Sequence, residues 1–349
     1  MAHAAQVLLG AARSGATIDG MKTRTLGTDG LTTSAIGYGA MALIDGMYGH
    51  ADDDRSLATL RHAVDAGATL IDTSDAYGAG ANERLVGRAI AGRRDRVQVA
   101  TKWGIVGAPG EHVHAVRHAH DQEILVDARP ERARPALEAS LERLGVETVD
   151  LWYLHFPDPG VPVEESVAAM APLVAEGKVR HIGLSNVTAE QVVAAHQVHP
   201  IAAVQSEYSL WTRDPERELL PVLRELGIGF VPWSPLGAGF FAGPVDAIGA
   251  PGEDFRTNHP RFRPENLAAN RDRYEPLRGL AGELRITPAQ LALAWLLHQG
   301  DDVVPIPGTR TPAHLDENLA AADVELDATT LARIDALAPA GAAAGSSLL

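Results

Sequence analysis

The most constraining feature of this 349-residue chain is a pattern that recurs eight times: a short apolar run, then polar or glycine residues, then an amphipathic segment. The runs are rich in Val, Ile and Leu, which is typical of parallel strands buried on both faces. They are Ser34–Tyr38, Thr69–Asp72, Arg96–Thr101, Thr148–His155, Val179–Ser185, Ala203–Glu207, Gly229–Trp233 and Val303–Ile306. Eight alternating strand–helix units favour an α/β fold of the (β/α)8 TIM-barrel type over an open doubly wound sheet.

The segments between these runs have the composition and end signals of helices, with glycines just past several ends and proline in several first turns. The predicted helices are Ser56–Ala66, Glu83–Ala91, Pro130–Leu144, Glu164–Glu176, Ala189–Val198, Pro215–Leu226, Pro288–Gln299 and Pro312–Ala321. Two connections, roughly 104–129 and 236–270, are too long for plain linkers. Both follow a strand, so we expect them to form lids or pocket walls on the face where barrel enzymes keep their chemistry.

The chain is predicted to hold one domain, because α/β barrels routinely reach this length. The barrel is assigned to residues 21–349. Residues 1–20 are interpreted as an N-terminal extension, either a tag remnant or disordered, because Met21 looks like a second start.

Composition excludes several classes of function. A formal net charge of −15 argues against nucleic-acid and membrane-surface partners, which need basic patches. The absence of cysteine rules out disulfides, thiolate catalysis and cysteine-based metal sites. No apolar run approaches the ~20 residues of a membrane span, and we expect a cytoplasmic protein. We also expect it to be a monomer or a weak homo-oligomer.

A histidine-rich segment covers residues 112–120, and His114 and His118 stand at the i,i+4 spacing that can place two metal ligands on one helix face. No carboxylate partner accompanies them at a fixed spacing. We therefore favour a structural or surface role and predict no metal site. Adventitious metal binding and a pH-sensitive lid are the alternatives.

Four chemically active side chains stand at the ends of three successive predicted strands: Asp72, Tyr77, Lys102 and His155. Alone, each has an ordinary structural role, such as a turn cap, a loop phenol or a satisfied core histidine. Together they form a coherent set of carbonyl-reducing groups. A lysine ammonium lowers the pKa of a nearby tyrosine, an aspartate holds the lysine, and a histidine can hydrogen-bond a carbonyl oxygen.

These residues make the chain resemble the aldo-keto reductase superfamily, of the bacterial and plant type, over nearly all of residues 21–340. The resemblance covers the Asp72–Tyr77–Lys102–His155 tetrad, including the five-residue step from Asp to Tyr, and the segment Gly183-Leu184-Ser185-Asn186. It extends to Gln205, to Trp233-Ser234-Pro235-Leu236-Gly237 and to Pro307-Gly308-Thr309-Arg310. A first-turn Gly-x-Gly-x-x-Gly fingerprint is absent, which disfavours a Rossmann domain.

The resemblance implies NADPH or NADP⁺ as cofactor, lying across the barrel mouth, with Tyr77 as the general acid. The expected cofactor-binding residues are Gly39, Met41, Asp72, Ser185, Asn186, Gln205, Trp233, Ser234, Leu236, Gly237, Gly308, Thr309, Arg310, His314, Glu317 and Asn318. Arg310 precedes a predicted helix start and is the candidate for binding a 2′-phosphate.

Three positions depart from patterns common among relatives. His314 and Ala238 replace basic residues, which puts the tightness of cofactor binding in doubt, and Phe156 replaces an arginine after the catalytic histidine. The expected pocket residues are Tyr48, Trp103 and Phe156, and they favour an apolar or aromatic carbonyl substrate. Two rival functions are a nucleotide-bound regulatory protein on this scaffold and a metal-dependent barrel enzyme, for which the strand ends carry too few ligands.

Overall fold

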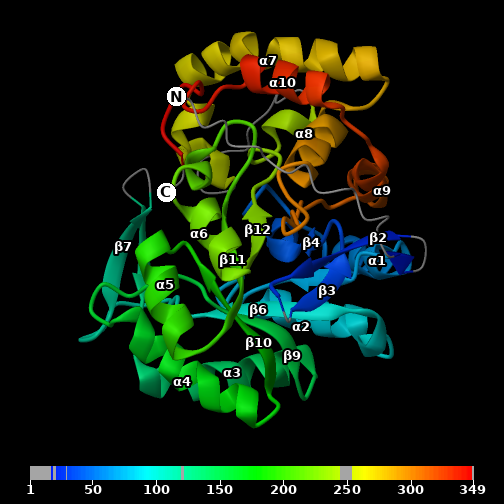
Figure 1. Ribbon diagram of the computed structural model, residues 1–349. Helices are drawn as coiled ribbons and strands as arrows, with labels where there is room; N and C mark the ends of the chain where they lie inside the picture. Colours follow the sequence, from blue (N-terminus) through cyan, green and yellow to red (C-terminus); the bar gives the residue numbers. More distant parts are fainter. Residues whose placement is uncertain (1–16, 19–20, 29, 119–121, 244–253, 348–349) are drawn as a thin grey trace, which may run out of the picture.

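The computed structural model describes residues 17–18, 21–28, 30–118, 122–243 and 254–347, and it has a barrel of parallel strands surrounded by helices (Figure 1). Seven strands pair in the order β12-β11-β10-β9-β6-β5-β4. The strands are β1 (Thr17–Ile18), β2 (Met21–Leu26), β3 (Leu31–Ser34), β4 (Tyr38–Gly39), β5 (Leu70–Asp72), β6 (Gln98–Trp103), β7 (His114–His118), β8 (Gln122–Val126), β9 (Val149–Leu154), β10 (Val179–Ser185), β11 (Ile201–Glu207) and β12 (Gly229–Trp233). The helices are α1 (Asp53–Asp65), α2 (Ala81–Ile90), α3 (Pro130–Leu144), α4 (Val163–Ala175), α5 (Ala189–Val198), α6 (Leu219–Leu226), α7 (Pro264–Leu284), α8 (Pro288–Leu297), α9 (Pro312–Ala320) and α10 (Ala328–Leu337).

The eighth predicted run closes the barrel, although it is not a regular strand. On the β12 side, Val304 N–H donates to the Phe230 carbonyl at 2.9 Å. On the β4 side, Gly37 N–H donates to the Pro305 carbonyl at 2.9 Å, and Gly39 N–H to the Pro307 carbonyl at 3.2 Å. Because Pro305 and Pro307 lack N–H groups, they accept hydrogen bonds on the β4 side but donate none. The (β/α)8 prediction is therefore confirmed.

A hairpin that the sequence analysis did not predict closes the bottom of the barrel. Strands β2 and β3 pair antiparallel ahead of the first barrel strand. Leu26 and Leu31 of this hairpin belong to the apolar cluster inside the barrel, with Leu70, Leu151, Val231 and others. A Cβ atom on Gly229 would lie 2.6 Å from the Cα atom of Leu26, so the glycine permits this close approach. The N-terminal end of the barrel is thus filled, and only the opposite end can open to a ligand.

Within the predicted N-terminal extension, Thr17 and Ile18 form the short strand β1, which pairs with β2. Residues 1–16 and 19–20 of that predicted extension lie outside the described residues.

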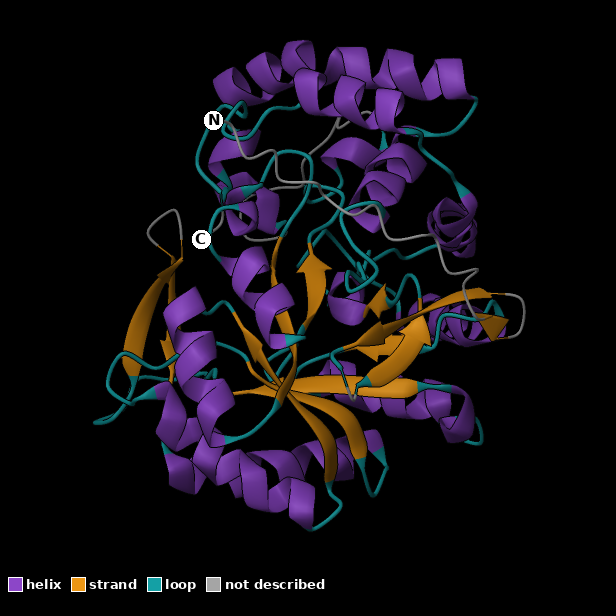
Figure 2. Cartoon of the chain, in the orientation of Figure 1, coloured by secondary structure: helices purple, strands orange, loops and turns teal. Residues whose placement is uncertain are grey.

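Most predicted helices are found within a few residues of their expected bounds, but α7 and α10 were missed. Helix α7 begins at Pro264, inside the connection predicted to run to residue 270. Figures 1 and 2 show α7 and α10 side by side across the helix layer, and the Arg333 guanidinium contacts the Glu283 carboxylate at 2.9 Å. With Pro276, Gly279 and Gly282 inside it, α7 carried several signals that usually end a helix.

The first long connection contains the antiparallel hairpin of β7 and β8, which places residues 114–118 of the histidine-rich segment on a strand. The predicted i,i+4 spacing along a helix face is therefore not formed by His114 and His118. In the part of the chain that the structure describes, no group of three His, Cys, Asp or Glu side chains could hold a metal ion.

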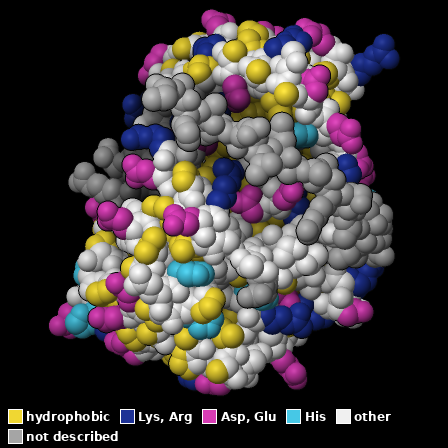
Figure 3. All heavy atoms as spheres, in the orientation of Figure 1, with side chains coloured by type: hydrophobic (Ala, Val, Ile, Leu, Met, Phe, Trp, Pro, Cys, Tyr) yellow, Lys and Arg dark blue, Asp and Glu magenta, His cyan; other side chains and the backbone are white. Residues whose placement is uncertain are grey.

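On the face drawn in Figure 3, basic side chains are scattered among acidic ones, and no basic patch gathers there. Among the described helices, none combines the length and apolar composition needed to cross a membrane.

Candidate active site

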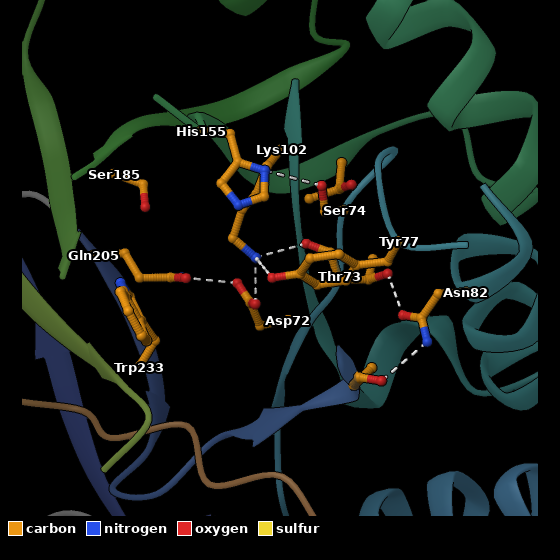
Figure 4. A network of polar contacts seen from close by, with 12 residues as sticks. Asp72, Thr73, Ser74, Tyr77, Asn82, Lys102, His155, Ser185, Gln205 and Trp233 are labelled. Atoms are coloured by element: carbon orange, nitrogen blue, oxygen red, sulfur yellow. Dashed lines mark hydrogen bonds and ion pairs between the residues drawn. The ribbon is translucent and has the colours of Figure 1, made fainter. Parts of the chain in front are cut away.

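The four residues singled out from the sequence meet at the carboxyl ends of the barrel strands (Figure 4). Asp72 ends β5, Lys102 lies in β6, and His155 follows β9. The Lys102 ammonium lies 2.5 Å from an Asp72 carboxylate oxygen and donates to the Thr73 carbonyl at 2.8 Å. It also lies 3.4 Å from the Tyr77 hydroxyl. One buried ammonium therefore joins the aspartate to the phenol.

Burial and charge act in opposite directions on the two central groups. Burial would lower the pKa of the Lys102 ammonium, but Asp72 and Tyr77 raise it above its ordinary value. Burial raises the pKa of the Tyr77 phenol, and the neighbouring Lys102 ammonium only partly opposes this effect. The Lys102 ammonium therefore lowers the pKa of the Tyr77 phenol, as expected, but by less than burial raises it. In the protein alone, Tyr77 keeps its proton across the neutral range.

Buried hydrogen bonds hold the loop that carries Tyr77. The Thr73 hydroxyl donates to the Asn82 side-chain oxygen at 2.6 Å, and the Asn82 side-chain nitrogen donates to the Ala40 carbonyl at 2.9 Å. The Asn82 backbone N–H donates to the Tyr77 carbonyl at 3.2 Å. Asn82 thus fixes both ends of the loop against the first barrel strand's exit.

Two neighbouring elements hold His155. Its Nδ1 atom lies 3.2 Å from the Ser74 hydroxyl oxygen, and its backbone carbonyl accepts from the Asn186 side-chain nitrogen at 3.0 Å. The centroids of the imidazole and the Tyr77 ring are 5.8 Å apart, with the rings nearly perpendicular. The imidazole and the phenol therefore face the same space.

A cavity of about 620 Å³ opens at this end of the barrel, within the usual range of ligand sites, ~300–1,000 Å³. Asp72, Tyr77 and His155 line it, whereas Lys102 is fully buried beneath it. Of the predicted cofactor residues, the following also line it: Gly39, Met41, Ser185, Asn186, Gln205, Trp233, Ser234, Leu236, Gly308, Thr309, Arg310 and His314. Gly237, Glu317 and Asn318 are not among its lining residues.

The predicted pocket residues are only partly brought together. Tyr48 and Phe156 line the cavity. Trp103 does not, because it is fully buried and stacks on Trp152 with ring centroids 5.4 Å apart. The prediction that Trp103 lines the substrate pocket is therefore corrected: its side chain belongs to the barrel's outer core.

The backbone around the cavity adopts conformations that side chains rarely allow. Asn186, Ser234 and Ala238 line the cavity and have φ values of +58°, +51° and +53°. Such strain persists only where the surroundings impose it, and it concentrates at functional sites. The amide of Asn186 spans three strand ends, because its side-chain oxygen also accepts from the Trp233 indole at 3.1 Å.

Arg310 lies directly before helix α9, as expected, but its guanidinium is already engaged. It donates to the carbonyls of Tyr48 at 2.6 Å and His50 at 2.7 Å. Arg310 therefore connects the loop that follows the eighth barrel strand to the loop that follows the first barrel strand. His314 is exposed, and its backbone N–H is capped by the Thr311 hydroxyl at 3.4 Å.

Sequence reasoning missed most of the apolar wall of the cavity. Met47, Ile105, Ile124 and Phe255 all line it. Ile124 comes from β8, so the long connection after the third barrel strand does form a pocket wall. Only its general position was predictable, because single apolar residues in loops carry no periodic signal.

Comparisons with known proteins agree with the fold. The aldo/keto reductase family model matches residues 35–339. A curated relative from Glycine max, a probable aldo-keto reductase 1, is 45% identical over 321 residues, covering 92% of this chain and 90% of its own. The chain therefore belongs to the aldo/keto reductase family, and it is an oxidoreductase.

Solved structures give the same assignment. A glycerol dehydrogenase from Gluconobacter oxydans superposes with a TM-score of 0.78 at 30% identity, covering 90% of this chain and 94% of that one. An aldo/keto reductase from Klebsiella pneumoniae, solved with NADP and acetate, has a TM-score of 0.69 at 29% identity, covering 92% and 96%.

Proposed function

We propose that this protein reduces apolar or aromatic aldehydes and ketones to alcohols with NADPH, and that Tyr77 is the general acid. The observation that carries the proposal is the buried contact of Lys102 with both Asp72 and Tyr77 beneath an open cavity. A lysine, an aspartate and a phenol that meet at one buried point serve proton transfer better than binding alone. A regulatory nucleotide-binding protein would have no need of that arrangement.

The cavity suits a nicotinamide dinucleotide, as in the Klebsiella pneumoniae relative solved with NADP. Ser185, Asn186 and Gln205 offer hydroxyl and amide groups to the cavity, and Trp233 offers an aromatic face. Close backbone contacts shape the opposite wall: a Cβ atom on Gly308 would lie 2.8 Å from the Gly39 carbonyl oxygen. These residues would hold the cofactor. NADPH would supply the hydride to the carbonyl carbon.

Side chains of the protein would carry out the proton transfer. Tyr77 donates its hydroxyl proton to the carbonyl oxygen as the alcohol forms. The Lys102 ammonium, 3.4 Å from that hydroxyl, stabilises the phenolate that remains. Asp72 keeps the ammonium charged and in place. His155 lines the same cavity and is positioned to orient the carbonyl oxygen by a hydrogen bond.

The apolar wall supports the proposed substrate class. Ile105, Ile124 and Phe156 line the cavity, and Phe156 stacks on the His155 imidazole with ring centroids 5.4 Å apart. Arg256 also lines the cavity, but Asp254 binds its guanidinium at 2.5 Å. Among the described residues, no unpaired cation would therefore lie beside a substrate carboxylate at Phe156. The free-energy cost of desolvating that carboxylate would not be offset.

Substituting Phe156 with Arg is expected to shift the substrate range toward carboxylated aldehydes. A guanidinium can form a charge-assisted pair with a carboxylate. We expect the kcat/KM ratio of benzaldehyde to 4-carboxybenzaldehyde to fall by about 10-fold or more. Phe156→Leu is the control, because it keeps the wall apolar and should keep the ratio. An unchanged ratio in Phe156→Arg would remove Phe156 from the substrate pocket.

Replacing Arg310 with Ala is expected to raise the KM for NADPH by about 10-fold or more and to change the KM for NADH much less. The guanidinium would bind the 2′-phosphate that only NADPH carries. Because Arg310 also holds the Tyr48 and His50 carbonyls, loosening that loop would affect both cofactors alike. Steady-state kinetics with each cofactor separate the two roles, and equal changes in both KM values would refute phosphate binding.

A further inference from the structure

The hydroxyl of Ser74 lies between a carboxyl group and the His155 imidazole. Ser74 is fully buried, and its Oγ atom is 3.2 Å from His155 Nδ1 and 3.3 Å from an Asp75 oxygen. The same Oγ atom accepts from the Ala76 N–H at 3.2 Å. A hydroxyl has one proton, so it can donate either to Asp75 or to His155, but not to both.

The direction of that proton depends on the charge of Asp75. When Asp75 is ionised, it can only accept, so it takes the Ser74 proton. Ser74 must then accept from His155 Nδ1–H, and Nε2 of the neutral imidazole carries no proton. When Asp75 is protonated, it donates to Ser74, and Ser74 donates to Nδ1. The imidazole then carries its proton on Nε2.

Only the second arrangement gives His155 a donor for a substrate oxygen. Figure 4 shows Nδ1 turned toward Ser74 and the other ring nitrogen turned toward Lys102 and Tyr77. That is the side on which a carbonyl oxygen would meet the phenol.

We propose that Asp75, acting through Ser74, sets which nitrogen of the neutral His155 imidazole is protonated, and so whether the site holds a hydrogen-bond donor for the carbonyl. Asp75 and Ser74 are positioning residues in this scheme, because neither touches the substrate. The inference rests on the proposed role of His155 in carbonyl reduction.

The surroundings of Asp75 place this change near neutral pH. Burial and the Glu83 carboxylate of α2 raise the pKa of the Asp75 carboxyl, and the Arg143 guanidinium of α3 and hydrogen bonds from Ser74 and the Ala76 N–H lower it, so that the pKa is about 7. From β6, the Lys102 carbonyl accepts the Asp75 backbone N–H at 3.4 Å. Ser74 and the rings of Tyr77 and Phe156 contact the imidazole.

The tautomer can be observed directly by ¹⁵N NMR of histidine-labelled protein between pH 6 and 8.5, with His155 assigned from the spectrum of His155→Gln. In the wild type we expect the neutral imidazole to change from the Nε2–H to the Nδ1–H form as pH rises. The imidazolium, with both nitrogens protonated, gives its own pair of shifts. Asp75→Asn should keep the Nε2–H form throughout, because its amide donates to Ser74 as the protonated carboxyl does. Ser74→Ala should abolish any coupling to Asp75.

Kinetics provide the second readout, with NADPH and benzaldehyde over the same pH range. We expect kcat of the wild type to fall by about 10-fold, and that of Asp75→Asn by less than about 2-fold. Asp54→Asn, at an exposed position of α1 that does not line the cavity, removes a similar charge and should follow the wild type. Because burial disfavours the charged carboxylate, the Asn variant should fold at least as well.

The relay is overturned if Asp75→Asn reproduces the wild-type tautomer and pH profile, or if Ser74→Ala leaves the pH-dependent tautomer change intact. Failure of the proposed function looks different: the wild type would reduce no carbonyl at any pH. The NMR measurement would still decide whether Asp75 controls the His155 tautomer.

Discussion

Replacing Tyr77 with Phe is expected to lower kcat for carbonyl reduction by about 100- to 10,000-fold, the usual contribution of a general acid. The Tyr77 hydroxyl lies 3.4 Å from the Lys102 ammonium, and Tyr77 lines the cavity. Phenylalanine keeps the ring and removes only the proton donor. We therefore expect the Kd for NADPH, measured by fluorescence titration, and the thermal stability to stay close to wild type.

A matched control is available in Tyr274→Phe. Tyr274 is more buried than Tyr77, at 2% exposure, its hydroxyl has no hydrogen-bond partner among the described residues, and it does not line the cavity. Its substitution should leave kcat unchanged. If Tyr77→Phe retains kcat within about 3-fold of wild type, Tyr77 is not the acid, since a general acid contributes far more.

Replacing Lys102 with Met is expected to destabilise the fold by about 3–5 kcal/mol at pH 7, because it leaves a buried carboxylate without its counter-ion. Asp72 would keep only the Gln205 side-chain nitrogen, which donates to its other oxygen at 2.9 Å. The raised pKa of Lys102 makes the stability due to this pair complete below the unfolded lysine pKa of about 10.4. That stability is lost only as pH rises through the folded value, so measurements at pH 7 see it in full.

The double variant Asp72→Asn/Lys102→Met tests the cause. Removing both charges should recover most of the lost free energy of unfolding, because no uncompensated ion remains. Urea unfolding of the two single variants and the double variant completes the cycle. Both Lys102 variants should be catalytically impaired, since the cation that opposes the effect of burial on Tyr77 is gone. A double variant less stable than Lys102→Met would contradict this account.

Local chemistry made much of the barrel predictable. Helices α3 and α5 begin and end at the predicted residues, because proline, capping residues and glycine act over a few neighbouring positions. The strand ends that carry Asp72, Lys102 and His155 were predictable for a related reason. In a parallel barrel, a polar residue that follows a buried apolar strand lies at the carboxyl edge of the sheet.

What depends on distant contacts was not predictable. The hairpin of β2 and β3 gains its stability by inserting Leu26 into a barrel assembled from strands far along the chain. Trp103 directly follows Lys102, yet strand alternation turns it away from the cavity and onto Trp152. The hydrogen bonds that Arg310 donates to carbonyls of the loop after β4 likewise form only when the barrel closes.

The tetrad could be predicted from short sequence segments, because they carry the identity and spacing of Asp72, Tyr77, Lys102 and His155 at successive strand ends. The electrostatics of that site, in contrast, depend on the folded barrel. The pKa of Tyr77 follows from the competition between its burial and one ammonium 3.4 Å away, and the contact of Ser74 with His155 joins residues 81 positions apart. Desolvation and hydrogen bonding depend on which groups surround an atom in space, and that is settled only when the barrel closes.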